Sequence, residues 1–439
     1  MTEQMNVPKL RFREFENFEI QSERLGTLVT MKSGNTPSKN NAEFWEGTIP
    51  WISASSMRGN VYSESENNVT QLALENGAKV ASKGSLLLLV RGSMLYNKIP
   101  VGFAGRDVTF NQDVKAVNLK NGDDNSYLFH WFKASEHKLL NMVTGTGIGA
   151  GKLDTEELLS LPFVQPTLSE QQKIASFLSK VDEKIGLLTE KKDKLTEYKK
   201  GVMQQLFNGK WGYVDGEDEG QVTFIPPTLR FKADDGSEFP DWEEKKLGEV
   251  VSTQKYAFTG GPFGSDLKSE DYTETGVRII QLQNIGDGYF NNDYKIYTSS
   301  AKADSLKSCN IYPGDLLLSK MGDPVARALL VPDTEERYVM CSDGIRIVPD
   351  VSRFNSYFLM SYINSPFFRN RAFSVSTGST RQRIGLTDLK SLPLIAPNIT
   401  EQTKIANFLS AIDQKIDLTS SELEKAKEWK KGLLQQMFV

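Results

Sequence analysis

Residues 161–207 have the sequence LPFVQPTLSEQQKIASFLSKVDEKIGLLTEKKDKLTEYKKGVMQQLF, and residues 392–438 have the sequence LPLIAPNITEQTKIANFLSAIDQKIDLTSSELEKAKEWKKGLLQQMF. The two stretches align without a gap from Leu161 opposite Leu392 to Phe207 opposite Phe438, and they share EQ, KIA, FLS, KI, KKG and QQ in the same order. Chance does not supply this many identities in register. The chain therefore contains an internal repeat, which decides the architecture before any single motif is considered.

Each copy of the repeat is predicted to be mostly one long helix. Its apolar residues are separated by steps of three and four, which is typical of a coiled-coil seam. Thr167 or Ser169 can cap the first helix, and Thr400 can cap the second. Pro166 and Pro397 end the extended segments that precede them. Each helix is about 38 residues long, which is roughly 57 Å at 1.5 Å per residue.

The apolar stripe of each helix needs a partner, because neither helix is apolar on all sides. The other copy is the nearest candidate, and we expect an antiparallel pair about a pseudo-two-fold axis. The alternative is that each helix packs on its own domain. The seam is expected to pass through Tyr198 and Trp429 near the helix ends. The residues predicted to pair the helices are Ile174, Leu178, Val181, Ile185, Leu188, Ile405, Leu409, Ile412, Ile416 and Leu423.

Weaker echoes extend the repeat over both halves of the chain. They are PKLRF at 8–12 with PTLRF at 227–231, GSLLL at 84–88 with GDLLL at 314–318, and NSY at 125–127 with NSY at 355–357. The order in each half is a short arm, a mixed domain and a long helix. The acidic, glycine-bearing stretch 208–221 is the expected linker.

The predicted fold is α+β, with two mixed α/β domains separated by two long antiparallel coiled-coil helices. The predicted parts are an arm at 1–20, a domain at 21–165, a helix at 166–207, a linker and second arm at 208–240, a domain at 241–397 and a helix at 398–439. Short apolar runs predict strands at 49–53, 85–90, 101–104, 113–118, 278–282, 315–319 and 344–348. Helices are predicted at 126–141 and 356–372.

Composition narrows the class of protein. The net charge of −4 argues mildly against nucleic-acid binding, although binding depends on the local field rather than on the whole-chain sum. The only cysteines, Cys309 and Cys341, form no CxxC pair and no zinc spacing, so neither a disulfide framework nor a structural metal is expected. The sequence has no signal core and no apolar run of membrane-spanning length, which predicts a cytoplasmic protein.

Three groups of residues suggest a catalytic or metal-binding motif, but none of them matches the pattern that the motif requires. The glycine-rich run GTGIGAGK at 145–152 lacks the spacing and the Ser or Thr of a phosphate-binding loop, so a loop that contacts DNA or the other domain is the preferred interpretation. His130 and His137 are two helical turns apart, which is the wrong spacing for paired metal ligands and predicts solvated or interface histidines. Asp241, Glu243 and Lys245 lie within one short stretch, whereas a nuclease site needs its first acidic residue well separated from the E-x-K strand.

The repeated frame LP…P…EQ.KIA.FLS..D.KI, ending in KKG..QQ.F, resembles the specificity subunits of type I restriction–modification systems. The segment SGNTPSKNNAEFWEGTIPWIS at 33–53 and NQD at 111–113 resemble that family's target-recognition domains. The resemblance covers essentially the whole chain. It implies a non-catalytic subunit that binds double-stranded DNA, two modification subunits and, in the full enzyme, two restriction subunits. It also implies that S-adenosylmethionine, ATP and magnesium are bound by those partners.

The same resemblance implies that each domain recognises one half of a split, asymmetric DNA site, and that the helix pair sets the gap between the halves. Two other hypotheses remain open: an enzyme with its own nuclease or methyltransferase activity, and a coiled-coil interaction protein that does not contact DNA. Polar and basic loop residues are the predicted DNA contacts. They are Lys32, Asn35, Thr36, Ser38, Lys39, Arg91, Asn97, Lys98, Asn111 and Gln112 in the first domain, and Phe263, Ser265, Lys268, Lys320, Arg327, Arg381, Gln382 and Arg383 in the second.

Overall fold

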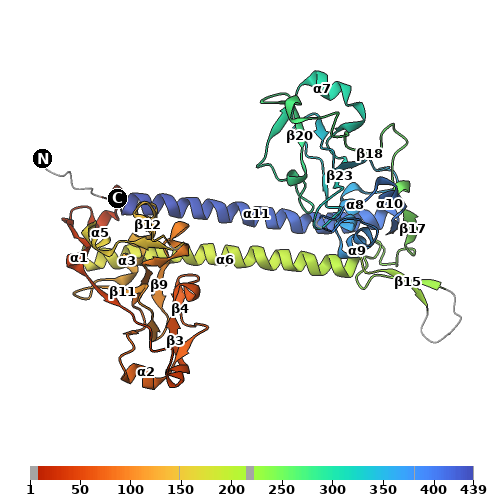
Figure 1. Ribbon diagram of the computed structural model, residues 1–439. Helices are drawn as coiled ribbons and strands as arrows, with labels where there is room; N and C mark the ends of the chain where they lie inside the picture. Colours follow the sequence, from red (N-terminus) through yellow and green to blue (C-terminus); the bar gives the residue numbers. More distant parts are fainter. Residues whose placement is uncertain (1–7, 148, 214–221, 380, 439) are drawn as a thin grey trace. The chain divides into compact units, whose positions relative to one another are not determined.

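The computed structural model describes residues 8–147, 149–213, 222–379 and 381–438. The chain divides into two compact units, Met1–Glu190 with Ser420–Val439 (unit 1) and Lys191–Thr419 (unit 2). Each unit holds one mixed domain and part of both long helices (Figure 1). Residues 1–7 of the predicted arm and 214–221 of the predicted linker lie outside the described residues, as do Ile148 and Thr380.

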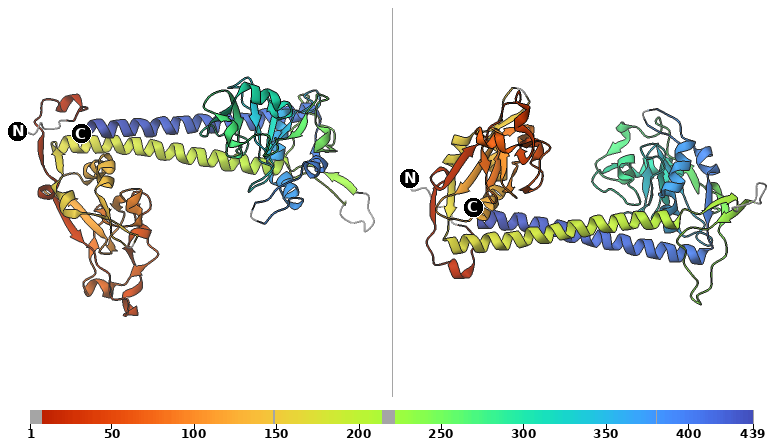
Figure 2. Two further views of the ribbon diagram at one scale, coloured as in Figure 1. Left: turned by 45° about the horizontal axis from the view of Figure 1, so that its top comes forward. Right: turned by 90° about the horizontal axis from the view of Figure 1, so that it is seen from below.

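The domain of unit 1, drawn in red to yellow in Figure 2, is built on two larger and two smaller sheets according to its strand pairing. The five-stranded sheet consists of β2 (Val29–Ser33), β11 (Val114–Leu119), β7 (Leu86–Leu89), β9 (Val101–Ala104) and β4 (Val61–Tyr62), in that order. The four-stranded sheet consists of β5 (Asn68–Val69), β3 (Trp45–Ile52), β10 (Val108–Phe110) and β6 (Val80–Ala81). The smaller sheets are β12 (Val143–Gly145) with β13 (Gly151–Leu153) and β8 (Arg91–Gly92), and β1 (Gln21–Arg24) with β14 (Pro162–Gln165). The helices are α1 (Leu25–Leu28), α2 (Gln71–Glu75), α3 (Asn125–Ala134), α4 (Glu136–Asn141), α5 (Thr155–Ser160) and parts of α6 (Leu168–Leu206) and α11 (Ile399–Met437).

The domain of unit 2 repeats this plan with different lengths. One sheet consists of β18 (Phe258–Gly260), β26 (Gly344–Ile347), β23 (Leu316–Ser319) and β24 (Ala328–Leu330). The other large sheet consists of β19 (Tyr272–Thr273), β21 (Ile296–Thr298), β20 (Val277–Ile280), β25 (Tyr338–Met340) and β22 (Asn310–Ile311). Two-stranded sheets join β17 (Glu243–Lys246) with β27 (Pro393–Ala396), and β15 (Lys210–Tyr213) with β16 (Val222–Ile225). The helices are α7 (Ser300–Ser305), α8 (Ser356–Ile363), α9 (Pro366–Ser374), α10 (Leu386–Ser391) and the remaining parts of α6 and α11.

The repeat predicted from sequence is confirmed by the strand pairing. In unit 1, β3 and β10 run parallel with Trp51 beside Thr109, and in unit 2, β20 and β25 run parallel with Ile279 beside Val339. Both domains also contain a buried, leucine-rich strand with antiparallel neighbours, β7 in unit 1 and β23 in unit 2. Both domains are therefore α+β versions of one scaffold.

Two expectations about local structure are wrong. The segments 126–141 and 356–372 each form two helices rather than one, because the chain turns at Ser135 in the first and at Ser365 before Pro366 in the second. Proline at the first helical position starts a helix readily but cannot continue one. The stretch 208–221 is also not all linker, since β15 pairs with β16.

The NSY echo proves to be out of register by one position. Asp124 caps α3 by accepting the Ser126 amide, whereas Asn355 caps α8 by accepting the Tyr357 amide. The structural counterpart of Asn355 is thus Asp124, in the same register as the long helices, and not Asn125 as the NSY match suggests.

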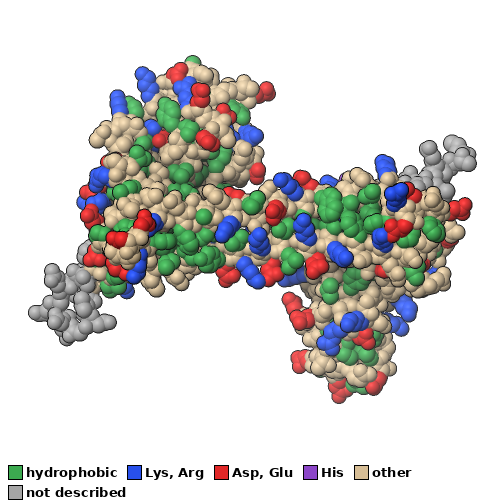
Figure 3. All heavy atoms as spheres, turned by 180° about the vertical axis from the view of Figure 1, so that it is seen from behind, with side chains coloured by type: hydrophobic (Ala, Val, Ile, Leu, Met, Phe, Trp, Pro, Cys, Tyr) green, Lys and Arg blue, Asp and Glu red, His purple; other side chains and the backbone are tan. Residues whose placement is uncertain are grey.

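The long helices pack both on their own domain and on each other within each unit. In unit 1, Ile174, Leu178 and Val181 of α6 share one apolar core with the domain and with Leu433 and Met437 of α11. In unit 2, Ile405, Leu409 and Ile412 of α11 share a core with Val202 and Leu206 of α6. Of the other predicted pairing residues, Leu423 is buried, and Ile185, Leu188 and Ile416 are half-buried. Charged side chains of both signs lie along the exposed sides of these helices (Figure 3).

The seam does not pass through Tyr198 and Trp429, which are 54% and 50% exposed. The neighbouring lysines take the seam positions instead. Lys199 pairs with Asp413 at 2.6 Å in unit 2, and Lys430 pairs with Asp182 in unit 1. The two pairs occupy equivalent positions of the repeat. Strict alternation of three- and four-residue steps selects these positions, and the facing aspartates compensate the lysine charge.

The arms clamp the start of each long helix, an arrangement that sequence reasoning missed. Arg11 forms a bidentate pair with Glu170 at 2.9 and 2.7 Å, and Arg230 forms the equivalent pair with Glu401 at 3.2 and 2.8 Å. Both glutamates are almost fully buried. The sequence features that could have indicated these pairs are the repeated EQ dipeptide and the repeated arginine of the arms.

The helix starts decide between the candidate caps. Thr167 Oγ1 accepts the Glu170 amide at 3.4 Å, so it caps α6. The expectation for Thr400 is wrong, because Asn398 Oδ1 accepts the Glu401 amide at 2.9 Å and α11 already begins at Ile399.

Of the two environments predicted for the histidines, solvated or interface, the solvated one does not apply to His130. It lies in α3 with 1% of its surface exposed, whereas His137 lies in α4 and is exposed. Burial and, to a smaller extent, Lys430 lower the pKa of His130 to about 4, although Asp182 and Asp124 oppose the shift. The folded protein therefore holds His130 neutral.

A pH-dependent stability follows from this depressed pKa. Between pH 6.5 and about 4 the unfolded chain binds a proton at His130 that the folded chain does not, so stability is lost as the pH falls through this window. The loss is at most roughly 3 kcal/mol. We expect His130→Gln to flatten the pH dependence of the free energy of unfolding in this window, measured by urea titration. His137→Gln is the matched control, and parallel curves for His130→Gln and the wild type would contradict the prediction.

Within the described residues, no helix is both long enough and apolar enough to span a membrane.

Candidate nucleic-acid interface

Each domain has a surface hollow at the same place in the repeated frame. In both, the walls come from the end of the buried leucine strand, the turn before the next sheet strand, and the segment before the last short helix of the domain. Hollow 1 has a volume of about 260 Å³ and is lined by Ser33, Val90, Arg91, Gln112, Asp113, Lys115, Lys152, Leu153 and Thr155. Hollow 2 has a volume of about 470 Å³ and is lined by Gly261, Pro262, Phe263, Gly264, Lys320, Ser342, Thr377, Arg383, Ile384, Gly385 and Asp388.

Beside each hollow, a glycine allows one loop to lie close to the backbone of another segment. A Cβ added to Gly34 would lie 2.1 Å from the Phe110 carbonyl oxygen, and one added to Gly261 would lie 1.8 Å from the Cys341 carbonyl oxygen. No side chain fits at these distances, so only glycine permits the loops to lie so close to the backbone. In unit 2 the loop continues through buried Pro262 and presents Phe263, which is 81% exposed.

Hollow 1 gathers three cations around one carboxylate. Arg91 and Lys152 are register partners across β8 and β13, which places them side by side on the sheet. Lys115 projects from β11 and donates to Ser33 Oγ. Burial lowers the pKa of Lys115, Arg91 lowers it further, and Asp113 opposes both.

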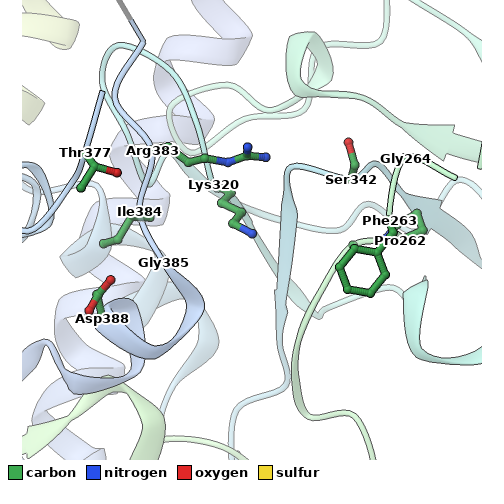
Figure 4. A pocket seen from close by; sticks show the side chains of 11 residues that line it. Pro262, Phe263, Gly264, Lys320, Ser342, Thr377, Arg383, Ile384, Gly385 and Asp388 are labelled. Atoms are coloured by element: carbon green, nitrogen blue, oxygen red, sulfur yellow. The ribbon is translucent and has the colours of Figure 1, made fainter. Parts of the chain in front are cut away.

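Hollow 2 has a more balanced set of charges and an aromatic wall (Figure 4). Arg383 is paired with Asp343, so its charge is compensated. Lys320 shares the hollow with Asp388, and Ser342 and Thr377 add hydroxyl groups that can donate or accept. Phe263 also lines an adjoining hollow of about 720 Å³. The same frame therefore offers a mixed polar and apolar surface here.

The structure brings together only part of the predicted DNA contacts. Arg91 and Gln112 line hollow 1; Phe263, Lys320 and Arg383 line hollow 2; and Ser265 lines the adjoining hollow. Thr36 lies beside hollow 1, where its hydroxyl donates to Gln112 Oε1 at 2.7 Å. Exposed predicted residues that line none of these hollows are Lys32, Ser38, Lys39, Asn97, Lys98, Lys268 and Arg381.

The side chains of four predicted contacts form hydrogen bonds within the protein. Asn111 is buried and bonds with Asp113, and Asn35 bonds with the Gly77 carbonyl and the Lys79 amide. Gln382 donates to the Gly378 carbonyl at 2.8 Å. Arg327 is half-buried and donates to the Leu282 carbonyl at 3.5 Å. These side chains shape the loops rather than the surface of the hollows.

Lys115, Lys152, Ser342, Thr377 and Asp388 were missed by sequence reasoning. The repeat itself held one signal, because Lys152 and Arg383 occupy equivalent positions when the register of the long helices is continued into the domains. Within the described residues, no group of three histidine, cysteine or acidic side chains could hold a metal ion.

The family model described as type I restriction modification DNA specificity domain matches residues 16–197 and again residues 240–428. The chain belongs to this family. Each match covers one mixed domain and most of the long helix that follows it, so the two specificity domains coincide with the two copies of the repeat.

Similar proteins agree with this assignment. The chain is 24% identical over 96% of its length to the type I restriction enzyme MjaVIII specificity subunit of Methanocaldococcus jannaschii, of which it covers 94%. It is 31% identical to the type I restriction enzyme EcoR124I/EcoR124II specificity subunit of Escherichia coli, over 43% of this chain and 49% of that one.

Solved structures show the same fold. A type I restriction–modification S subunit from M. genitalium gives a TM-score of 0.56 at 17% identity, covering 99% of both chains. A chain from a structural study of complex assembly and conformational transition of the type I R-M system gives 0.54 at 17% identity, covering 95% of this chain and 97% of that one. These likenesses confirm the fold class predicted from the repeat.

Proposed function

We propose that this chain is the DNA-recognising subunit of a type I restriction–modification enzyme, and that each specificity domain recognises one half of a split, asymmetric site on double-stranded DNA. One observation carries the proposal. The two domains place hollows at equivalent positions of one scaffold but line them with different side chains. A shared scaffold with different surfaces suits the recognition of two different half-sites.

The chemistry of the hollows suits base edges. Arginine and lysine donate to guanine or phosphate, amide groups suit adenine, and apolar side chains contact the thymine methyl group. Arg91, Gln112 and Lys320 belong to the first two types, and Phe263 belongs to the third. The acidic whole-chain charge is compatible with this function if partner subunits supply further phosphate contacts.

The proposed partners are two modification subunits and, in the complete enzyme, two restriction subunits. Exposed apolar side chains at equivalent places on the long helices support docking of two like partners: the repeat aligns Leu187 with Leu418, and Tyr198 with Trp429. We assign S-adenosylmethionine, ATP and magnesium to those partners, and we propose that this chain contributes recognition without catalysis.

The long helices are proposed to set the number of base pairs between the half-sites. Each helix is continuous over 39 residues and contributes to both units. A helix of that length is stiff over roughly 58 Å, more than the 34–36 Å between half-sites one DNA turn apart.

An exchange of domains tests the proposal. Residues 21–165 are replaced by the first specificity domain of another family member, and the methylated sites are mapped in cells that carry the system. We expect one half-site to change, while the other half-site and the gap length stay the same. The control exchanges a domain for one with the same known half-site. If both half-sites remain unchanged, or if the gap changes with the domain, the modular assignment is wrong.

A further inference from the structure

We propose that hollow 1 binds the major-groove edge of a guanine in the half-site recognised by the first specificity domain, with Arg91 as the main donor. This inference rests on the proposed function and names the base that the site selects. Three features of the molecule support it: the charges in the hollow, the free donors on its walls and the contrast with hollow 2.

Hollow 1 carries an excess of positive charge. Arg91, Lys115 and Lys152 line it together with a single carboxylate, Asp113. Asp154 lies just outside, where it caps α5 through the Glu156 amide and approaches Lys152 at 3.7 Å. In hollow 2 the equivalent of Lys152 is Arg383, which is paired with Asp343, and Lys320 shares the hollow with the carboxylate of Asp388. A ligand rich in acceptors is therefore favoured in hollow 1 only.

Two donors of hollow 1, the Arg91 guanidinium and the Gln112 amide nitrogen, are free to bind. Among the described residues, no hydrogen bond or ion pair engages the guanidinium of Arg91, which is exposed. The oxygen of the Gln112 side-chain amide already accepts the Thr36 hydroxyl at 2.7 Å, which leaves the amide nitrogen to donate. Pairing of Arg91 with Lys152 across β8 and β13 fixes the backbone from which the guanidinium projects.

Guanine is the base whose edge matches these donors. Its N7 and O6 are both acceptors and take the two-pronged guanidinium, whereas adenine places an amino donor next to N7, and cytosine presents a donor. A thymine edge adds a methyl group, which suits Phe263 of hollow 2 better than the polar walls of hollow 1. A DNA phosphate is also an acceptor, so the experiment must separate a base contact from a phosphate contact.

The test uses the full chain in complex with its modification subunits. Bound duplexes are selected from a random-sequence pool, and the half-site assigned to the first domain by the domain exchange is compared between variants. We expect a guanine in this half-site. Arg91→Met, which introduces the residue found at Met321, the bridge partner of Arg383 as Arg91 is the strand partner of Lys152, should reduce the preference for that guanine roughly 5- to 150-fold. Gln112→Glu, which replaces the free amide donor of hollow 1 with a carboxylate, should weaken the same preference. Arg106→Met, an exposed arginine outside hollow 1, should change neither half-site.

Three results would overturn the inference. One is a half-site without guanine, and another is an unchanged guanine preference in Arg91→Met. The third is a loss of affinity that is equal for all sequences, with a smaller salt dependence, because that is the signature of a phosphate contact. If the wild-type complex shows no sequence preference at all, the proposed function itself fails. That outcome is distinct, because the first three leave a sequence-specific complex in place.

Discussion

Glu401→Ala is expected to lower the free energy of unfolding by about 3–5 kcal/mol. The Glu401 side chain is fully buried, and that of Arg230 is only 14% exposed. Their bidentate pair raises the pKa of Arg230 through the hydrogen bond to Glu401. Removing the carboxylate leaves the guanidinium at the start of α11 with only the Phe239 and Pro240 carbonyls as partners. An unpaired charge in that place costs far more than the pair contributes.

Urea titration of the full chain, followed by circular dichroism, measures this loss. Glu424→Ala is the control, because Glu424 pairs with Lys427 on the exposed surface of α11, and exposed pairs contribute about 0–1 kcal/mol. If Glu401→Ala loses no more stability than Glu424→Ala, the arm does not clamp the helix as described. Glu170→Ala should repeat the large effect in unit 1, since Arg11 and Glu170 form the equivalent pair.

Gly261→Ala is expected to abolish recognition of one half-site while the other is retained. The added methyl group would lie 1.8 Å from the Cys341 carbonyl oxygen, and backbone on both sides must move to admit it. The displaced loop would carry Pro262 and Phe263 away from Lys320, so hollow 2 would lose its aromatic wall. We also expect a loss of stability of about 1–3 kcal/mol, as for other overpacked sites.

Gly260→Ala provides a matched control one position away, because nothing lies within 4 Å of a Cβ added at Gly260. Selection of bound duplexes from a random pool gives the readout for each half-site separately. The prediction is contradicted if Gly261→Ala leaves the preference at both half-sites intact, or if Gly260→Ala has the same effect. A loss at both half-sites would indicate general unfolding rather than a local change in hollow 2.

Tyr198 and Trp429 show where periodicity alone fails. Because each is an apolar residue next to a seam position, it is predicted to lie in the seam itself. The strict alternation of three- and four-residue steps passes instead through Lys199 and Lys430. A lysine can occupy such a position only if a remote segment supplies its counter-charge, which here comes from Asp413 and Asp182. The sequence around each lysine does not indicate which aspartate is its partner.

The sequence could not show which of the predicted DNA contacts line a hollow, for a related reason. Asn111 and Arg91 are both polar loop residues in the sequence, and composition cannot rank them. The fold turns Asn111 inward to bond with Asp113 and leaves Arg91 on the wall of hollow 1. Lys115 and Lys152 join Arg91 through strand pairing between segments that are far apart in the chain.

The sequence by itself determined the repeat, the two long helices and the α+β class of the domains, because identity in register and apolar periodicity are local properties of the chain. Tertiary structure alone decided which cations share hollow 1, which aspartates compensate the seam lysines, and that the arm arginines meet buried glutamates. Each of those choices depends on the charge and burial that distant segments supply, and these exist only once the strands and helices have paired.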